Sequence, residues 1–191
     1  FAGLIERRFV INQALFGRSK TIAFAGLGNF VYLADANFLP HGETHMHGHK
    51  EVDVISVMVA GDIIHQGSLG HGQRLTAGSV QVQRAGAEGF HHNEVNPNAQ
   101  QNHMIQLWVL PDQPGEAAGY KHYQPKQGEH IKIYGGSKTQ QATFNSAISV
   151  SVSNTVVQQS INITGEAMVY LSLGEAKING EVIQARTLVH D

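Results

Sequence analysis

Short apolar segments separated by glycine-rich turns constrain the possible folds of this chain most strongly. Between residues 30 and 110 these segments are Phe30–Leu33, Val52–Val59, Ile63–His65, Ser79–Arg84 and Met104–Leu110. They have the length of strands rather than helices, and the fourth alternates strictly between polar and apolar residues. Turn signals follow them, such as Gly61 after the second segment and Pro111 after the last. The pattern predicts an all-β fold, an antiparallel sandwich or barrel.

Composition excludes several kinds of site and partner. The 191 residues include no Cys, which excludes disulfides, thiolate zinc sites, iron–sulfur clusters and a cysteine nucleophile. The balance of 13 Lys+Arg against 15 Asp+Glu argues against direct binding to nucleic acid. No apolar run approaches the roughly 20 residues that cross a bilayer, and no secretory signal pattern is visible. We therefore expect a cytoplasmic protein without a membrane partner.

The segment Pro111–Gly136 is the strongest candidate for a boundary. It contains three prolines and several glycines, and we interpret it as an extended connector without a core of its own. Strand-like segments return at Ala142–Gln158 and Ile161–Ile183, where Asn179-Gly180 predicts a tight hairpin. We expect one unit over residues 1–125 and a second over residues 126–191.

Histidines are concentrated in the first of these units. The chain has 12, and nine of them lie between residues 41 and 103. His45, His47 and His49 alternate, so in a strand all three point to the same face. His92 and Glu94 form a second such pair, and two strands of one barrel could direct both pairs at a single ion. Solvated or adventitious histidines are the alternative interpretation, and His45 stays open as a competing ligand.

The donor set indicates which metal would bind. Imidazoles with one carboxylate and open coordination positions suit Fe(II) best, while Mn, Ni, Cu, Co and Zn are alternatives. Ligating imidazoles normally donate their second N–H to an acceptor, for which Asp53 and Gln81 are candidates. Met58 and Val82 are apolar residues of predicted strands. They belong either to the hydrophobic core or to the wall of a substrate pocket.

Two stretches resemble cupin motifs. The first runs from Gly42 through His47-x-His49-x3-Asp53 to Gly61. The second runs from Gly70 to Gln81, which stands where most cupins have their third histidine. In the pirin family that histidine and the carboxylate come later, after an Ala-Gly turn, and here Ala85-Gly86 precedes His92-Asn93-Glu94. The chain is similar to bacterial pirin-related proteins over residues 45–125.

This resemblance implies a bicupin, two jelly-roll barrels of which only the first binds metal. The implied ligands are His47, His49, His92 and Glu94. If Gly174 is superposed on Gly61, Ser160 and Asn162 take the places of the first two histidines, and both are poor ligands. The second unit is therefore expected to lack a metal. It is also short, so it is abbreviated, completed by a partner, or truncated.

Two departures from the family pattern affect the ligand set. Gly48 replaces the proline that usually stands between the first two histidines. The turn before His92 is one residue longer than usual, which makes His91 an alternative ligand. Adjacent strand residues face opposite ways, so only one of the two can bind, and the spacing to Glu94 favours His92.

The resemblance also implies an activity. Pirins resemble flavonol (quercetin) 2,3-dioxygenases, which implies a phenolic substrate, dioxygen, and Glu94 as the general base for the substrate hydroxyl. One alternative is a non-catalytic, redox-responsive metal protein that acts through a protein partner. Another is a cupin enzyme with a different substrate, since fold does not determine function.

Overall fold

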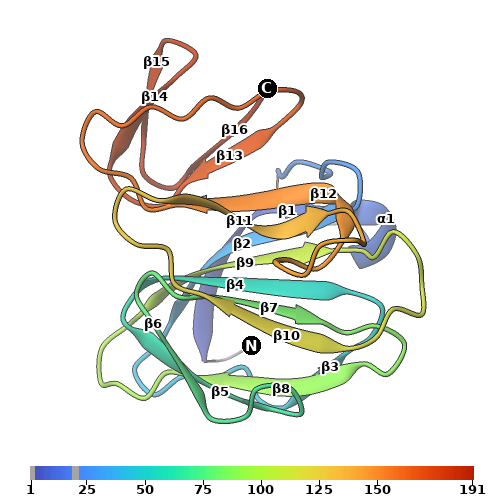
Figure 1. Cartoon of the computed structure of the whole chain (residues 1–191). Helices are drawn as coiled ribbons and strands as arrows, with labels where there is room; N and C mark the ends of the chain where they lie inside the picture. The colour runs from blue at the N-terminus through green and yellow to red at the C-terminus, as the bar shows by residue number, and fades with distance from the viewer. Residues whose placement is uncertain (1–2, 19–21) are drawn as a thin grey trace. The chain divides into compact units, whose positions relative to one another are not determined.

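The computed structural model describes residues 3–18 and 22–191 and is built almost entirely of strands (Figure 1). By compactness the chain divides into two units, Phe1–Gln159 and Ser160–Asp191. Among the described residues the one helix is α1 (Gln13–Phe16), and no helix is long and apolar enough to cross a membrane. The expected all-β fold is therefore confirmed.

The first unit contains a six-stranded antiparallel sheet with the order β1-β2-β9-β4-β7-β10. Its strands are β1 (Leu4–Ile11), β2 (Phe30–Phe38), β4 (Asp53–Ala60), β7 (Val80–Arg84), β9 (His103–Val109) and β10 (Gly119–Tyr123). The middle strand β4 is apolar over most of its length, as expected for a strand buried on both faces.

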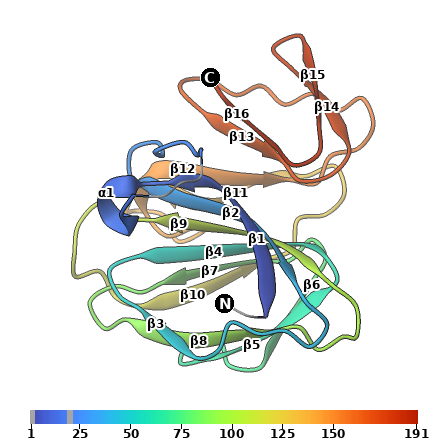
Figure 2. The ribbon, with the colours of Figure 1, turned by 180° about the vertical axis from the view of Figure 1, so that it is seen from behind.

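A four-stranded antiparallel sheet forms the second layer, with the order β3-β8-β5-β6. Its strands are β3 (His47–His49), β5 (Asp62–Gly67), β6 (Gln73–Thr76) and β8 (Phe90–Val95). Figures 1 and 2 show from opposite sides how this sheet lies against the larger one. Core residues from both sheets pack between the layers: Phe38, Met58, Ile63, Leu75 and Met104. Met58 thus belongs to the core.

The strand β7 is buried on both faces because another layer covers it from outside. β11 (His130–Gly136) and β12 (Ser146–Ser153) pair as a hairpin, and Ile133 and Tyr134 of β11 are fully buried. Val80, Val82 and Arg84 alternate with Gln81 and Gln83, and all five side chains are buried. The alternation in β7 therefore separates two buried environments rather than core from solvent.

The segment Pro111–Gly136 is not the extended connector that was expected. Its strand β10 pairs with β7 in the large sheet, and β11 contributes buried side chains. The prolines and glycines lie mainly in the turns around these strands, which are too short to show a clear period. The strand β1 was also not anticipated. The boundary at residue 125 stays a prediction, while the first compact unit continues to Gln159.

The second unit consists of two small antiparallel pairs. β13 (Met168–Leu171) pairs with β16 (Thr187–His190), and β14 (Glu175–Ile178) pairs with β15 (Glu181–Gln184). The turn between β14 and β15 is Asn179-Gly180, with φ of 48° and 89°. Positive φ at both positions is what a two-residue hairpin needs, so the predicted hairpin is confirmed.

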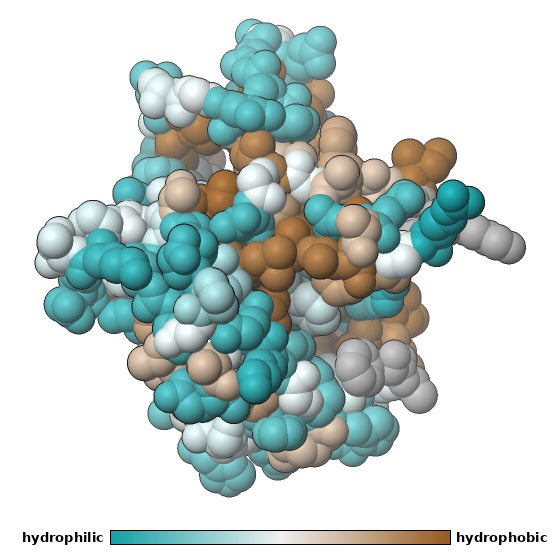
Figure 3. Space-filling model, turned by 90° about the vertical axis from the view of Figure 1, so that its right-hand side faces the viewer, coloured by the Kyte–Doolittle hydropathy of each residue, from teal (hydrophilic) through white to brown (hydrophobic). Residues whose placement is uncertain are grey.

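Part of the apolar surface is exposed to solvent. Figure 3 shows apolar side chains in the middle of one face with hydrophilic ones around them. The exposed large apolar residues near the helix are Leu15, Phe16, Ile22 and Phe24. Phe16 also reaches the cavity described below.

Candidate metal centre

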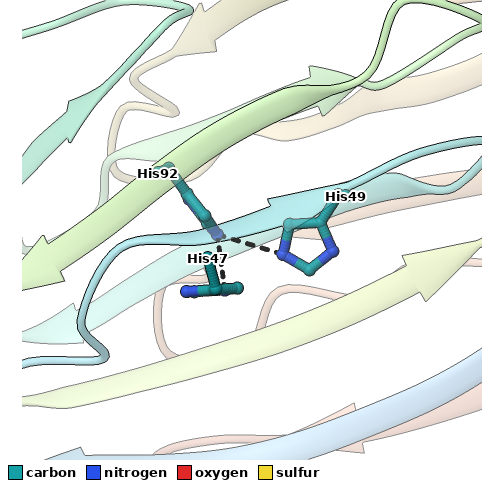
Figure 4. Close-up of side chains that lie close together, drawn as sticks. All are labelled: His47, His49 and His92. Atoms are coloured by element: carbon teal, nitrogen blue, oxygen red, sulfur yellow. Dashed lines mark hydrogen bonds between the residues drawn. The ribbon is translucent and has the colours of Figure 1, made fainter.

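Three histidines meet where β3 pairs with β8. His47 lies directly opposite His92 in the ladder, and His49 is two residues along β3 on the same face. The Nε2 atom of His92 is 3.0 Å from Nε2 of His47 and 3.1 Å from Nε2 of His49 (Figure 4). One ligand nitrogen from each of the three rings lies within 4.8 Å of the other two.

This spacing fits a shared metal ion. Two imidazole nitrogens at a right angle around an ion, each bonded at about 2.1 Å, are separated by about 3.0 Å. Neutral imidazole is the form that binds metal. Burial, together with the neighbouring imidazoles, lowers the pKa of His92 to about 2 and that of His49 to about 4. Both rings are therefore neutral at physiological pH.

The orientation of His47 is set by the backbone just before β3. The His45 carbonyl accepts a hydrogen bond of 2.8 Å from Nδ1 of His47, which leaves Nε2 with its lone pair toward the other rings. His45 itself has φ of 61°, and its exposed ring lies 3.3 Å from the Glu43 carboxylate. The positive φ breaks the strand alternation, so His45 lies outside the group of three.

His91 and His92 are separated as adjacent strand residues should be. The His91 side chain is exposed, whereas His92 is fully buried. The structure therefore brings His92 to the cluster and leaves His91 outside it.

Glu94 lies on the same strand face as His92 but outside the group of three histidines. It is completely buried, and its Oε1 accepts hydrogen bonds of 3.0 Å from both Ser56 Oγ and Gln81 Nε2. Its Oε2 accepts one longer bond of 3.3 Å from Gln106 Nε2. Burial raises the pKa of Glu94 to about 7, although these hydrogen bonds oppose the rise. The carboxyl group can thus hold or release a proton near neutral pH.

A cavity in the first unit joins His47 and Glu94 to an aromatic wall. Tyr32 and Trp108 stack there, with ring centroids 4.7 Å apart and planes at 30°. Phe16 packs against both at 5.5–5.7 Å, and Trp108 meets His49 edge-on at 5.3 Å. The wall therefore extends from the histidine cluster to a partly exposed phenylalanine.

Sequence comparison assigns the segment that carries these residues. Residues 20–109 match the Pirin family model. The chain carries a pirin domain. The quercetin 2,3-dioxygenase of Escherichia coli is 30% identical to it over 90 residues, which are 46% of this chain and 38% of that enzyme. The first curated relatives are matched over about a third of their length, 33% and 34%.

Solved structures support the fold of the pirin domain. A nickel(II) complex of the bacterial pirin YhhW from Escherichia coli superposes with a TM-score of 0.70 at 16% identity, covering 100% of this chain and 84% of that one. A quercetin 2,3-dioxygenase from Acinetobacter baumannii gives 0.57 at 19% identity, covering 99% and 71%. These likenesses confirm the expected cupin β-sandwich.

The two polar candidates for orienting the imidazoles lie elsewhere in the pirin domain. Gln81 donates to Glu94, not to a histidine. Asp53 is fully buried and accepts hydrogen bonds of 3.0 Å from Arg84 and 2.6 Å from the Tyr134 hydroxyl. It is neither an imidazole acceptor nor a solvated charge, because Tyr134 of the β11–β12 hairpin and Arg84 of β7 cover it on the outer face of the large sheet.

Gln83 is the residue that sequence reasoning missed. Its amide nitrogen lies 3.3 Å from Nδ1 of His92, the ring nitrogen that points away from His47 and His49. The signal was present in the alternation of Ser79–Arg84, which puts Gln83 on the same face as Gln81.

Proposed function

We propose that the pirin domain binds one divalent metal ion and acts as a flavonol 2,3-dioxygenase on a phenolic substrate and dioxygen. The observation that carries this is the convergence of three Nε2 atoms beside a buried carboxyl group, at one end of an aromatic-walled cavity. Fe(II) is the proposed ion, with Mn, Ni, Cu, Co or Zn as alternatives. A cytoplasmic location is part of the same proposal.

His47, His49 and His92 would hold the ion, and Glu94 is the proposed fourth ligand for part of the cycle. A bound divalent ion supplies a Lewis acid, which lowers the pKa of a hydroxyl group bound to it. Three histidine ligands would leave further coordination positions for that hydroxyl, and His47 also lines the cavity. The cluster therefore has the composition that the proposed chemistry needs.

Glu94 is proposed to remove the proton of the substrate hydroxyl. A general base works best with a pKa near the working pH, and burial raises the pKa of Glu94 to about 7. Two donors hold its Oε1 and one more distant donor contacts Oε2, so we expect the proton on Oε2. Ser56 and Gln81 would keep the carboxyl group oriented while it gains and loses the proton.

The aromatic wall supports a planar aromatic substrate. Trp108 and Tyr32 offer ring faces and edges between Phe16 and the histidines, and aromatic pairs favour offset or edge-to-face contacts. The curated relative from Escherichia coli is named for quercetin, a molecule of this kind.

The test is oxygen uptake by the iron-loaded chain with quercetin. We expect uptake that requires both the metal and quercetin, and its loss in His49→Ala. Stoichiometric metal binding without uptake on quercetin or other phenols would contradict the dioxygenase proposal and favour a redox-responsive metal protein. Uptake with another phenol alone would correct only the substrate.

A further inference from the structure

Behind His92, on the side away from the other two histidines, lies a row of buried polar groups. Gln83 of β7 is 3.3 Å from His92 Nδ1, and the His65 ring of β5 has its centroid 5.5 Å from that of His92. On the other side of the His65 ring, its Nδ1 atom lies 3.0 Å from the Gly70 carbonyl oxygen. The side chains of Gln83, His65 and His92 are completely buried. Bulk water does not reach these side chains, so they depend on hydrogen bonds with the buried groups around them.

The Gly70 carbonyl determines the tautomer of His65. A carbonyl oxygen can only accept, so His65 Nδ1 carries the hydrogen. Burial lowers the pKa of His65, although the contacts with Gly70 and the Gln83 side chain oppose this, so the ring is neutral. Its Nε2 is then an acceptor, and this buried atom has no hydrogen-bond partner in the described structure.

The loop that supplies this carbonyl is held in place by packing. Gly70 has φ of +66°, and a Cβ at this position would lie 3.0 Å from the ring of Tyr120. Tyr120 in turn donates to Gln81 at 3.4 Å. The Gly70 carbonyl oxygen is therefore held in one position, where it faces His65 Nδ1.

Gln83 has one orientation that satisfies both of its neighbours. Its buried Oε1 has no donor when the amide nitrogen faces His92. Amide oxygen and nitrogen are distinguished by the hydrogen bonds they make. With the nitrogen donating to His65 Nε2, the oxygen accepts from His92 Nδ1–H, and the unpartnered atoms of Gln83 and His65 gain a partner together.

We propose that Gln83 and His65 are positioning residues that hold His92 in the Nδ1–H tautomer. The row runs from the Gly70 carbonyl through His65 and Gln83, and it leaves the Nε2 lone pair of His92 facing the other two histidines. Partners of this kind orient a ligating imidazole and raise its basicity. The consequence for metal binding rests on the proposed metal site, whereas the tautomer is a property of the metal-free chain.

The first experiment measures the tautomer of His92 by two-bond 1H–15N NMR on the full, metal-free chain with labelled histidine. The signals of His92 are assigned with His92→Gln. We expect a single Nδ1–H tautomer in the unmodified chain. Gln83→Met has a similar length but no amide, and we expect a mixture of both tautomers. Gln83→Glu keeps an acceptor and should restore the Nδ1–H form.

The second experiment measures Ni(II) affinity by competition with a chromophoric chelator. Gln83→Met should weaken binding about 10- to 100-fold, and Gln83→Glu should recover most of the loss. Gln66→Met is the matched control, because Gln66 contacts Asn93 rather than an imidazole. We expect its affinity to stay within about twofold of the unmodified chain.

His65→Phe tests the row independently of any change at Gln83. It removes the acceptor that orients the amide, so we expect mixed tautomers of His92 and weaker Ni(II) binding. An Nε2–H form of His92 in the unmodified chain would overturn the proposal, as would an unchanged tautomer in His65→Phe. If the unmodified chain binds no Ni(II), the proposed metal function fails, while the NMR result still decides the role of the row.

Discussion

His47 and His92 face each other across the β3–β8 ladder with their Nε2 atoms 3.0 Å apart. Antiparallel neighbours on one face are the closest side chains that two strands can present. The pairing places two imidazoles from residues 45 positions apart at the separation that a shared ion requires, and His49 adds a third donor from the same face.

The ligand set predicts opposite results for two histidines of the same tract. His49→Ala should weaken Ni(II) binding by more than about 100-fold, because it removes a direct ligand rather than a supporting partner. His45→Ala is the control, since this ring is exposed and outside the cluster. Isothermal titration of both variants checks the prediction. Equal losses would instead make His45 a ligand.

Glu94→Gln separates the role of a base from that of a ligand. The amide is isosteric but cannot take up the substrate proton, so we expect most turnover to be lost while metal content stays near that of the unmodified chain. Oxygen uptake and metal analysis on the same sample check this. Full activity would exclude Glu94 as the base, and loss of the metal would make it an essential ligand.

Acid should destabilise the metal-free chain. Burial lowers the pKa of His92 to about 2 and of His49 to about 4, and also lowers that of His65, whereas unfolded histidine titrates near 6.5. Below pH 6.5 the unfolded chain thus binds protons that the folded chain does not bind.

The protonation of Glu94 has the opposite effect on the stability of the fold. Burial raises its pKa to about 7, so its protonation stabilises the fold as the pH falls from about 7 toward 4.5. His92 and His49 together outweigh Glu94, and His65 acts in the same direction as these two histidines. We therefore expect the free energy of unfolding to decrease by at least about 1 kcal/mol per pH unit between pH 6 and 5. Urea unfolding with a chelator present measures this, and a flat profile would contradict the neutral, buried histidines.

The buried ion pair between Arg84 and Asp53 predicts a large loss of stability on truncation. Both side chains are at least 96% buried, and the Tyr134 hydroxyl also donates to Asp53. Arg84→Met leaves the carboxylate without its cation, which should cost about 3–5 kcal/mol in the free energy of unfolding.

A second ion pair provides the control for Arg84→Met. Arg74 pairs with Asp62, but the Arg74 side chain is 60% exposed, so Arg74→Met should cost less than about 1 kcal/mol. Urea unfolding of both variants compares the two losses. Similar values would show that the Arg84 pair is not buried against the β11–β12 hairpin.

Much of the site followed from the sequence because strand periodicity acts locally. Alternation determines that His47 and His49 share a face, and that His92 and Glu94 share one, whatever the neighbouring strands are. The same local chemistry explains the Asn179-Gly180 hairpin. By contrast, β1, β10 and β11 have no clear period, and their pairing depends on distant partners.

The all-β class, the two histidine-bearing pairs and the hairpin were thus determined by the sequence alone, because each depends on residues within a few positions. Only the tertiary structure decided which side of β7 faces the site, since its glutamines point inward and its valines face the outer hairpin. It also decided that Asp53 is buried with Arg84 and that His45 turns away at a positive φ. Alternation along a strand shows which residues share a face, but the layer that packs against that face determines which residues they contact.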